Sequence, residues 1–367
     1  MSGSSDLAPV LSLPLPAPAT HNLIEPSALI RHFLEHPPAG FFIRDLGNGV
    51  AAFSAPFDLL TTVEPSVQRA IGALPLGRLL RRLLVARTCF IGTTVSEYSL
   101  FPRGTSAHGL ANDLADHVAP EYPFLIVKDL PDDSVLVGEA AWAWSQQLAN
   151  ACLSRGFVAL EGQALAYIPI DFDSVDELLM RRSHARRKNL RRKLKATSSL
   201  RIDEIRSGDD AFFDSQLLER LYALYLNVYQ QSEIHFDLLT EGFLRAVLQD
   251  PSVRGIVFLY YDGSELIGFN LCFREGSMLI DKYIGLAYPQ ARHHNLYAVS
   301  WFHNLDYALT HGFRNYVAGW TDPEVKRELG AKFTFTKHMV YVRNPVLRGI
   351  LRPLKRFFES DHERRAR

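Results

Sequence analysis

The sequence predicts an α/β fold in two domains, and three observations support this prediction. The chain has 367 residues, more than one domain usually holds at about 150 residues per domain. Hydrophobic residues make up 47% and charged residues 22%, a composition typical of globular rather than disordered chains. Strand-like and helix-like runs alternate along the chain, which favours a sheet covered by helices over an all-α or all-β fold.

Charge and cysteine content exclude several classes of protein. Lys and Arg together number 40, and Asp and Glu together also number 40, so the formal net charge is zero. The chain as a whole is therefore not a strongly basic nucleic-acid-binding protein. Cys89, Cys152 and Cys272 lie far apart and form no CxxC or Cys/His cluster. We therefore expect neither a disulfide scaffold nor a metal site.

The N-terminal residues 1–21 are rich in Pro and Ala and carry no Lys or Arg. We expect a flexible leader rather than a secretory signal, which needs a charged region and an unbroken apolar core. No apolar run reaches the roughly 18 residues that span a bilayer. These features predict a cytoplasmic protein.

The first αβ block is expected over residues 22–173. Short strands at 40–44 and 49–53 flank a Gly-containing turn, since Gly allows the positive φ that such turns need. Further strands are expected at 88–93, 123–128 and 157–169, and helices at 26–35, 67–85, 110–118 and 137–155.

A basic inter-domain helix is expected over residues 174–199. Ser174 and Glu177 form a capping-box pattern at its start. From Arg181 to Lys195 the sequence has nine Lys or Arg residues and no acid. This helix face either contacts a polyanion, mainly through Arg186, Arg187, Arg191 and Arg192, or is a solvated surface between domains.

The second αβ block is expected over residues 200–345. A strand at 200–205 and helices at 212–232 and 240–249 come first. A hairpin of 255–261 and 265–274 follows, joined by Asp262-Gly263-Ser264. A third strand at 277–286, a helix at 295–312 and strands at 315–320 and 333–342 complete the block. Three consecutive strands before the main helix distinguish this order from a Rossmann alternation.

This order and three stretches of sequence resemble the GNAT acyltransferase superfamily, in particular its tandem-domain branch of CelD/BcsL-like and FemAB-like (peptidoglycan biosynthesis/recognition) proteins. The stretches are RRSHARRKNLRRKLKA (181–196), DKYIGLAYPQARHHNLYAVSWFHNLDYALTHGF (281–313) and AGWTDPEVKRELGAKF (318–333), with added support from CFIGTTVSEY (89–98). The resemblance covers about residues 40 to 350. It implies two tandem GNAT-like domains, each a mixed sheet flanked by helices.

The resemblance also implies a function. We expect an N-acyltransferase that moves an acyl group from acyl-CoA to a small-molecule or peptide amine by direct attack, with no bound cofactor. The turn at 288–296 contains no glycine, however, and side chains there keep a pyrophosphate from the close approach usual in GNAT enzymes. A FemAB-type transferase that uses aminoacyl-tRNA is the alternative, and a non-catalytic module that binds an envelope glycan or peptide is another.

The donor is expected at the turn before the main helix. Arg292, His293 and His294 can hold a phosphate at the N-terminus of that helix, with Asn295 as its N-cap. Lys326, in the polar loop after the following strand, is expected to bind a phosphate of the donor or a carboxylate of the acceptor. The alternative is an ordinary capped turn and a surface lysine.

The reaction needs a group that takes a proton from the acceptor ammonium. Asp281 and Tyr283 alternate along one strand and are expected on one face, and Glu233 lies beyond the preceding helix. These three are the candidate catalytic residues. The candidate acceptor contacts are Ser232, His235, Trp320 and Asp322.

The tail, residues 346–367, continues a basic amphipathic pattern that begins near Asn344. Apolar residues recur at helical spacing with Arg and Lys between them, a pattern that seats helices at membrane interfaces. Docking on the protein's own first domain is the alternative. The sequence predicts no particular oligomeric state.

Overall fold

A computed structural model describes residues 20–47, 49–58, 85–232 and 236–354. The expected helix at 67–85 and most of the leader and tail lie outside these residues. In the described part of the chain, no helix is both long and apolar enough to cross a membrane.

The described residues form one large mixed sheet and a two-stranded ribbon, β1 (Thr20–His21) with β5 (Phe101–Pro102). The large sheet begins with β2 (Phe42–Asp45), β3 (Ala51–Asp58), β4 (Val85–Ile91), β6 (Phe124–Pro131) and β13 (Lys332–Val342). It continues through β7 (Val158–Pro169), β12 (Asn315–Val317), β11 (Met278–Leu286), β10 (Glu265–Glu275), β9 (Gly255–Asp262) and β8 (Arg201–Arg206).

The two halves of this sheet repeat one topology. In the first half β2, β3 and β4 form an antiparallel meander, and β6 adds parallel to β4. In the second half β9, β10 and β11 form the meander, and β12 adds parallel to β11. The expected α/β class with two tandem mixed-sheet units is therefore confirmed, as is the hairpin of β9 and β10.

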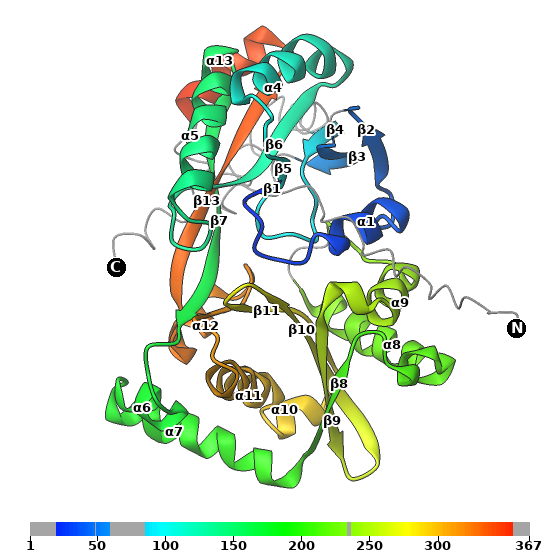
Figure 1. The fold of residues 1–367 in the computed structure, drawn as a ribbon, viewed down its shortest axis with the longest axis vertical. Helices are drawn as coiled ribbons and strands as arrows, with labels where there is room; N and C mark the ends of the chain where they lie inside the picture. The colour runs from blue at the N-terminus through cyan, green and yellow to red at the C-terminus, as the bar shows by residue number, and fades with distance from the viewer. Residues whose placement is uncertain (1–19, 48, 59–84, 233–235, 355–367) are drawn as a thin grey trace, which may run out of the picture.

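The last strands of the two halves are exchanged. β7 comes from residues 22–173 and pairs with β12 of the other half, whereas β13 comes from residues 200–345 and lies between β6 and β7. Figure 1 shows these two long strands running between the halves. One hydrogen-bonded sheet therefore joins both halves.

Helices cover both faces of the second half. α8 (Ser215–Gln231) and α9 (Glu241–Gln249) lie on one side of β10 and β11, and α10 (Gln290–His293) and α11 (Leu296–Thr310) lie on the other (Figure 1). Among the described residues of the first half, the connecting helices are α1 (Ala28–Glu35), α4 (Ala107–Asp113) and α5 (Glu139–Ser154). One hydrophobic core runs from Phe33 in the first half to Phe313 in the second.

The basic segment is two helices rather than the single helix expected. α6 (Val175–Met180) begins at Ser174, whose hydroxyl accepts a hydrogen bond from the Glu177 amide at 3.2 Å. α7 (His184–Leu194) begins at Ser183, whose hydroxyl accepts from the Arg186 amide at 3.4 Å. Because Ser183 provides a second N-cap, the chain turns before the main cationic run. A 3-10 turn at Lys195–Ser199 follows α7.

Two helices are the last in the described part of the chain. α12 (Pro323–Leu329) lies between β12 and β13, and α13 (Pro345–Leu354) follows β13. α13 corresponds to the start of the amphipathic pattern that the sequence predicts, whereas residues 355–367 lie outside the described part of the chain.

Candidate active site at the junction of the two halves

The parallel strands β11 and β12 separate soon after they meet. The two strands pair only where Met278–Ile280 of β11 lies beside Asn315–Val317 of β12. β11 then continues to Leu286, while the chain leaves β12 at Ala318. The carboxyl ends of adjoining strands are the usual ligand position in α/β sheets, so this region is the candidate active site.

A β-bulge in β11 places the expected catalytic residues on opposite faces of the sheet. Leu271 pairs with Tyr283 and Cys272 pairs with Asp281, so Lys282 is an extra residue on this strand. An extra residue breaks the alternation of side chains. The expectation that Asp281 and Tyr283 share a face is therefore wrong.

Asp281 faces α11 and has hydrogen-bond donors on both carboxylate oxygens. Asn270 donates to Oδ1 at 2.6 Å, while Tyr316 and Asn304 donate to Oδ2 at 2.6 and 3.1 Å. Burial raises the pKa of the Asp281 carboxyl above its usual value, although the bonds from Tyr316 and Asn270 oppose this shift. The carboxylate is thus held firmly within the sheet–helix layer.

Tyr283 faces α9 instead. Its ring packs edge-on against Phe243 and Phe273, with centroids 6.2 Å away in each case. Its hydroxyl is buried without a hydrogen-bond partner, and burial raises its pKa well above the usual value. The structure does not bring Tyr283 and Asp281 together as a proton relay.

Lys282 forms a buried ion-pair cluster with the first half of the chain. Its Nζ lies 2.7 Å from Glu97 Oε1 and 3.6 Å from Glu25 Oε1. The Glu97 amide donates to the same Glu25 oxygen at 2.5 Å. Both glutamates are only 1% exposed. Burial raises the pKa of Glu25 to about 8, although Lys282 opposes the shift.

Lys326 of α12 lies beside this cluster. Its side chain is only 4% exposed, so the alternative expectation of an ordinary surface lysine is wrong. A Cβ built on Gly319 would lie 3.8 Å from Lys326 Nζ and 4.0 Å from both Glu97 Oε1 and the Asp281 carbonyl oxygen. These three residues therefore meet around Gly319. Burial lowers the pKa of Lys326 to about 8, although Asp281 and Glu97 oppose the shift. We call Glu25, Glu97, Lys282 and Lys326 the junction cluster.

The expected donor turn is built differently from a simple strand-to-helix turn. The short helix α10 precedes α11, and Asn295 adopts a left-handed φ of 51° with no side-chain capping bond. Asn295 is the N-cap residue of α11, as expected, but the expected capping bond from its side chain is not formed. Exposed Arg292 donates to Gln231 Oε1 at 3.0 Å and lies over the ring of Tyr288, 5.0 Å from its centroid.

The two histidines of the turn have different surroundings. His293 is exposed, whereas His294 is nearly buried. His294 Nε2 lies 2.8 Å from Asp262 Oδ2, and its Nδ1 lies 3.4 Å from Ser199 Oγ. His294 thus links the turn to the segment that follows α7.

The expected acceptor contacts are only partly described. Glu233 and His235 lie outside the described residues, and Ser232 follows the last turn of α8. Trp320 packs edge-on against Tyr98, 6.4 Å away, in the small core between the halves. Asp322 is exposed at the start of α12, with φ 53° and no side-chain capping bond.

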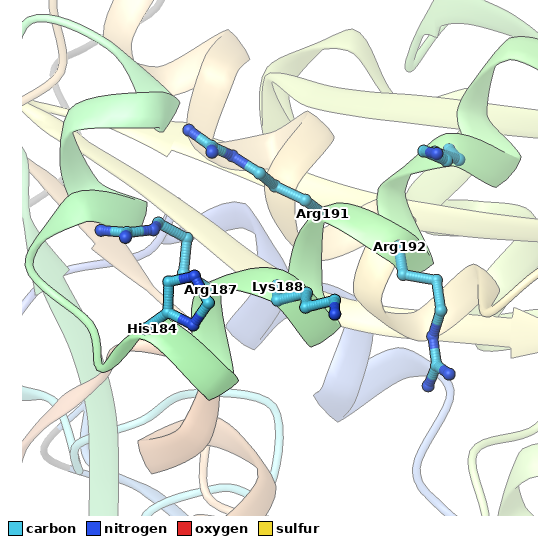
Figure 2. A pocket seen from close by; sticks show the side chains of 6 residues that line it. His184, Arg187, Lys188, Arg191 and Arg192 are labelled. Atoms are coloured by element: carbon cyan, nitrogen blue, oxygen red, sulfur yellow. The ribbon is translucent and has the colours of Figure 1, made fainter.

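One face of α7 lines a hollow of about 480 Å³ on the surface. Figure 2 shows the lining side chains, which recur at helical spacing: His184, Arg187, Lys188, Arg191, Arg192 and Lys195. Arg186, the fourth arginine expected to contact a polyanion, is exposed but is not among them.

The cations of this α7 face are mostly unneutralised. Arg191 pairs with Asp176 at 3.0 Å, and Arg192 donates to Asn189 at 2.9 Å. Arg187 and Lys188 form no ion pair with a carboxylate among the described residues. α7 packs on α11 through buried Leu190. The cationic face therefore belongs to the same half as the donor turn.

Sequence reasoning missed Glu25, Glu97 and Lys282, as well as Asn270, Asn304 and Tyr316 around Asp281. A signal was present in the strand Met278–Leu286, where two adjacent charged residues interrupt an apolar run. Charges within a buried strand require partners. The strand alone, however, does not reveal which distant segment supplies them.

Comparison with known proteins gives a family and a fold. Residues 135–365 match the FemAB-like family, described as peptidoglycan biosynthesis/recognition. No curated protein sequence matches the chain. The fold is similar to the C-terminal domain (DUF2156) of a putative lysylphosphatidylglycerol synthetase from Agrobacterium fabrum, at 9% identity and a TM-score of 0.51, covering 88% of each chain. It is also similar to L-PGS from Bacillus licheniformis, at 11% identity and a TM-score of 0.50, covering 90% of this chain and 97% of that one. At such low identities these likenesses show the fold alone.

Proposed function

This chain belongs to the FemAB-like family, and from this membership we propose that it is an aminoacyltransferase that forms an amide bond between an aminoacyl group carried by tRNA and an amine acceptor. We choose tRNA as the carrier of the donor group because of the cationic face of α7 and the hollow that it lines. The resemblance to FemAB-type transferases is consistent with an aminoacyl donor. So is the similar fold of a putative lysylphosphatidylglycerol synthetase, whose name describes a lysyl product.

The α7 face suits a nucleic-acid backbone. Its eleven residues span about 16 Å at 1.5 Å per residue, so its cations line up along one direction rather than around one small anion. Cations that share a helix face repel one another, and a row of phosphates relieves that repulsion while releasing counterions. A solvated face gains nothing from such an arrangement.

The junction cluster suits the transfer step. The acceptor amine attacks the ester carbonyl of the aminoacyl group, a C–N bond forms, and the ester C–O bond breaks. The leaving ribose oxygen takes up a proton, and the acceptor loses one. The Lys326 ammonium is the group that we place near the carbonyl oxygen as negative charge develops there. Burial lowers the pKa of that ammonium to about 8, and Asp281 and Glu97 oppose the shift by favouring the charged form.

Binding measurements at several salt concentrations test the donor. We expect charged tRNA to bind, with an affinity that falls steeply as salt rises. Replacing Arg187, Lys188, Arg191 and Arg192 together by Ala should weaken binding and lower the slope of log K against log salt by as much as about 3, since each phosphate contact contributes roughly 0.7–0.9.

A matched control keeps the same change in net charge. Its four substitutions fall on exposed arginines outside α7: Arg103, Arg155, Arg245 and Arg274. This control should retain the wild-type slope. Equal slopes for all three proteins would contradict a role for α7. Binding of acyl-CoA but not of tRNA would replace the proposal with a CoA-dependent acyltransferase.

A further inference from the structure

The junction cluster contains carboxylate oxygens that the protein leaves without partners. Glu25 uses Oε1 to accept the Glu97 amide, and Glu97 uses Oε1 to bind Lys282. The second oxygen of each, Oε2, is buried and has no hydrogen-bond partner. An unpartnered carboxylate oxygen away from water is costly, so two in one cluster indicate a missing donor.

The charge balance points to the kind of donor. The carboxyl groups of Glu25, Glu97, Asp237 and Asp281 interact electrostatically with the lysines of the cluster. Burial is the main cause of the raised pKa values of Glu25, Asp237 and Asp281. Lys282 and Lys326 are the cations of the cluster itself. Lys128 also acts on Asp237, but it already pairs with Asp129. Because burial raises the pKa of Glu25 to about 8, its carboxyl carries a proton near neutral pH, and the other three carboxyl groups face two lysines. An ammonium ion bound between the two glutamates would displace the Glu25 proton.

We propose that Glu25 and Glu97 bind the primary ammonium group of a substrate through their Oε2 atoms. An ammonium has three N–H donors, enough for both oxygens and one further acceptor. The hydroxyl of Tyr283 is also buried without a hydrogen-bond partner. Glu97 and Glu25 both contribute to the raised pKa of this hydroxyl, so it shares their electrostatic environment.

This inference depends on the proposed function in one respect: the proposed reaction supplies the two molecules from which the ammonium group can come. An aminoacyl group carries an α-ammonium next to the carbonyl that reacts, and an amine acceptor carries one at the end of its own chain. A neutral acyl group carries none. Binding of the donor's α-ammonium here would therefore distinguish aminoacyl donors from simple acyl donors by charge, whereas binding of the acceptor's ammonium would place the acceptor and leave the donor open.

Calorimetric titration with small amines tests the proposal without any RNA. L-Alaninamide represents the aminoacyl α-ammonium, Nα-acetyl-L-lysinamide represents a terminal acceptor amine, and N-acetyl-L-alaninamide lacks the charge. We expect one of the two amines to bind the wild-type chain and the uncharged compound not to bind. The amine that binds identifies the source.

Variants then assign the binding to the two glutamates. Glu25→Gln and Glu97→Gln should each weaken binding about ten- to a hundredfold, the range for a hydrogen bond to a charged group. Glu328→Gln, on the exposed side of α12, should leave binding unchanged. Gln retains an oxygen at the Oε1 position, and if Glu97→Gln does not fold, Glu25→Gln alone decides the test.

Three results would overturn the proposal: no binding of either amine, equal binding of N-acetyl-L-alaninamide, or unchanged affinity in folded glutamine variants. None of these depends on tRNA. Loss of RNA binding by the α7 variant together with intact amine binding would support both proposals, whereas failure of only one measurement would refute only the corresponding proposal.

Discussion

Replacing Glu25 by Gln should change how the stability of the protein depends on pH. The pKa of Glu25 is raised from 4.5 to about 8 by burial. Because the folded state holds this proton more tightly than the unfolded state, Glu25 contributes stability below its unfolded pKa. That contribution is lost as pH rises toward the folded pKa. Gln is uncharged at all pH values and removes this dependence.

The size of the effect follows from the width of the pH window. Between pH 5.5 and 7.5 Glu25 is ionised in the unfolded state and largely protonated in the folded state. One proton difference costs about 1.36 kcal/mol per pH unit. The wild-type chain should therefore lose about 2–3 kcal/mol of unfolding free energy relative to Glu25→Gln across these two units. Lys282 titrates well above this window, because Glu97 and Glu25 outweigh the effect of burial and raise its pKa.

Guanidinium denaturation at pH 5.5, 6.5 and 7.5 measures this difference. The two stability curves should converge at the acidic end and separate steadily as pH rises, with the variant becoming the relatively more stable protein. Glu328→Gln is the control and should run parallel to the wild type. Parallel curves for Glu25→Gln would refute the assignment of a buried, protonated carboxyl to this position.

Three further changes test the surroundings of the site. Tyr316→Phe removes a donor 2.6 Å from the Asp281 carboxylate and should lower the unfolding free energy by about 1.5–3 kcal/mol; a denaturation midpoint equal to wild type would contradict this role. Gly319→Ala should cost about 1–2 kcal/mol, because φ at this position is 73° and a Cβ is strained there, although the space is sufficient; an unshifted melting temperature would argue against strain. Arg292→Ala should raise the donor KM roughly ten- to a hundredfold with the melting temperature nearly unchanged, since its guanidinium is exposed; an unchanged KM would remove Arg292 from the donor site.

Much of the fold is predictable because its determinants are local. The apolar runs of β9, β10 and β11 and the turn at Gly263 predict the second meander, since neighbouring residues settle strand and turn preferences. The cap at Ser174 is predictable for the same reason. The restart of the helix at Ser183 was missed, although Ser is a strong N-cap, because the cationic run continues across it.

The candidate site is less predictable because its determinants are distant in sequence. Arg187, Arg191 and Arg192 were found from the charge run alone, and the structure places them on one face of α7. The face assignment of Asp281 and Tyr283 failed at a bulge, which no periodicity reveals, because one extra residue in the strand reverses the alternation beyond it.

The α/β class, the repeated order of strands and helices, and a basic helical segment between the two halves follow from the amino-acid sequence alone. Two features become visible only in the folded chain: β7 and β13 exchange partners, and Glu97 lies against Lys282, 185 residues away along the chain. Helix and strand formation depend on hydrogen bonds and side-chain spacing within one segment. A buried charge instead depends on which other segment packs over it, and only the folded chain brings the two together.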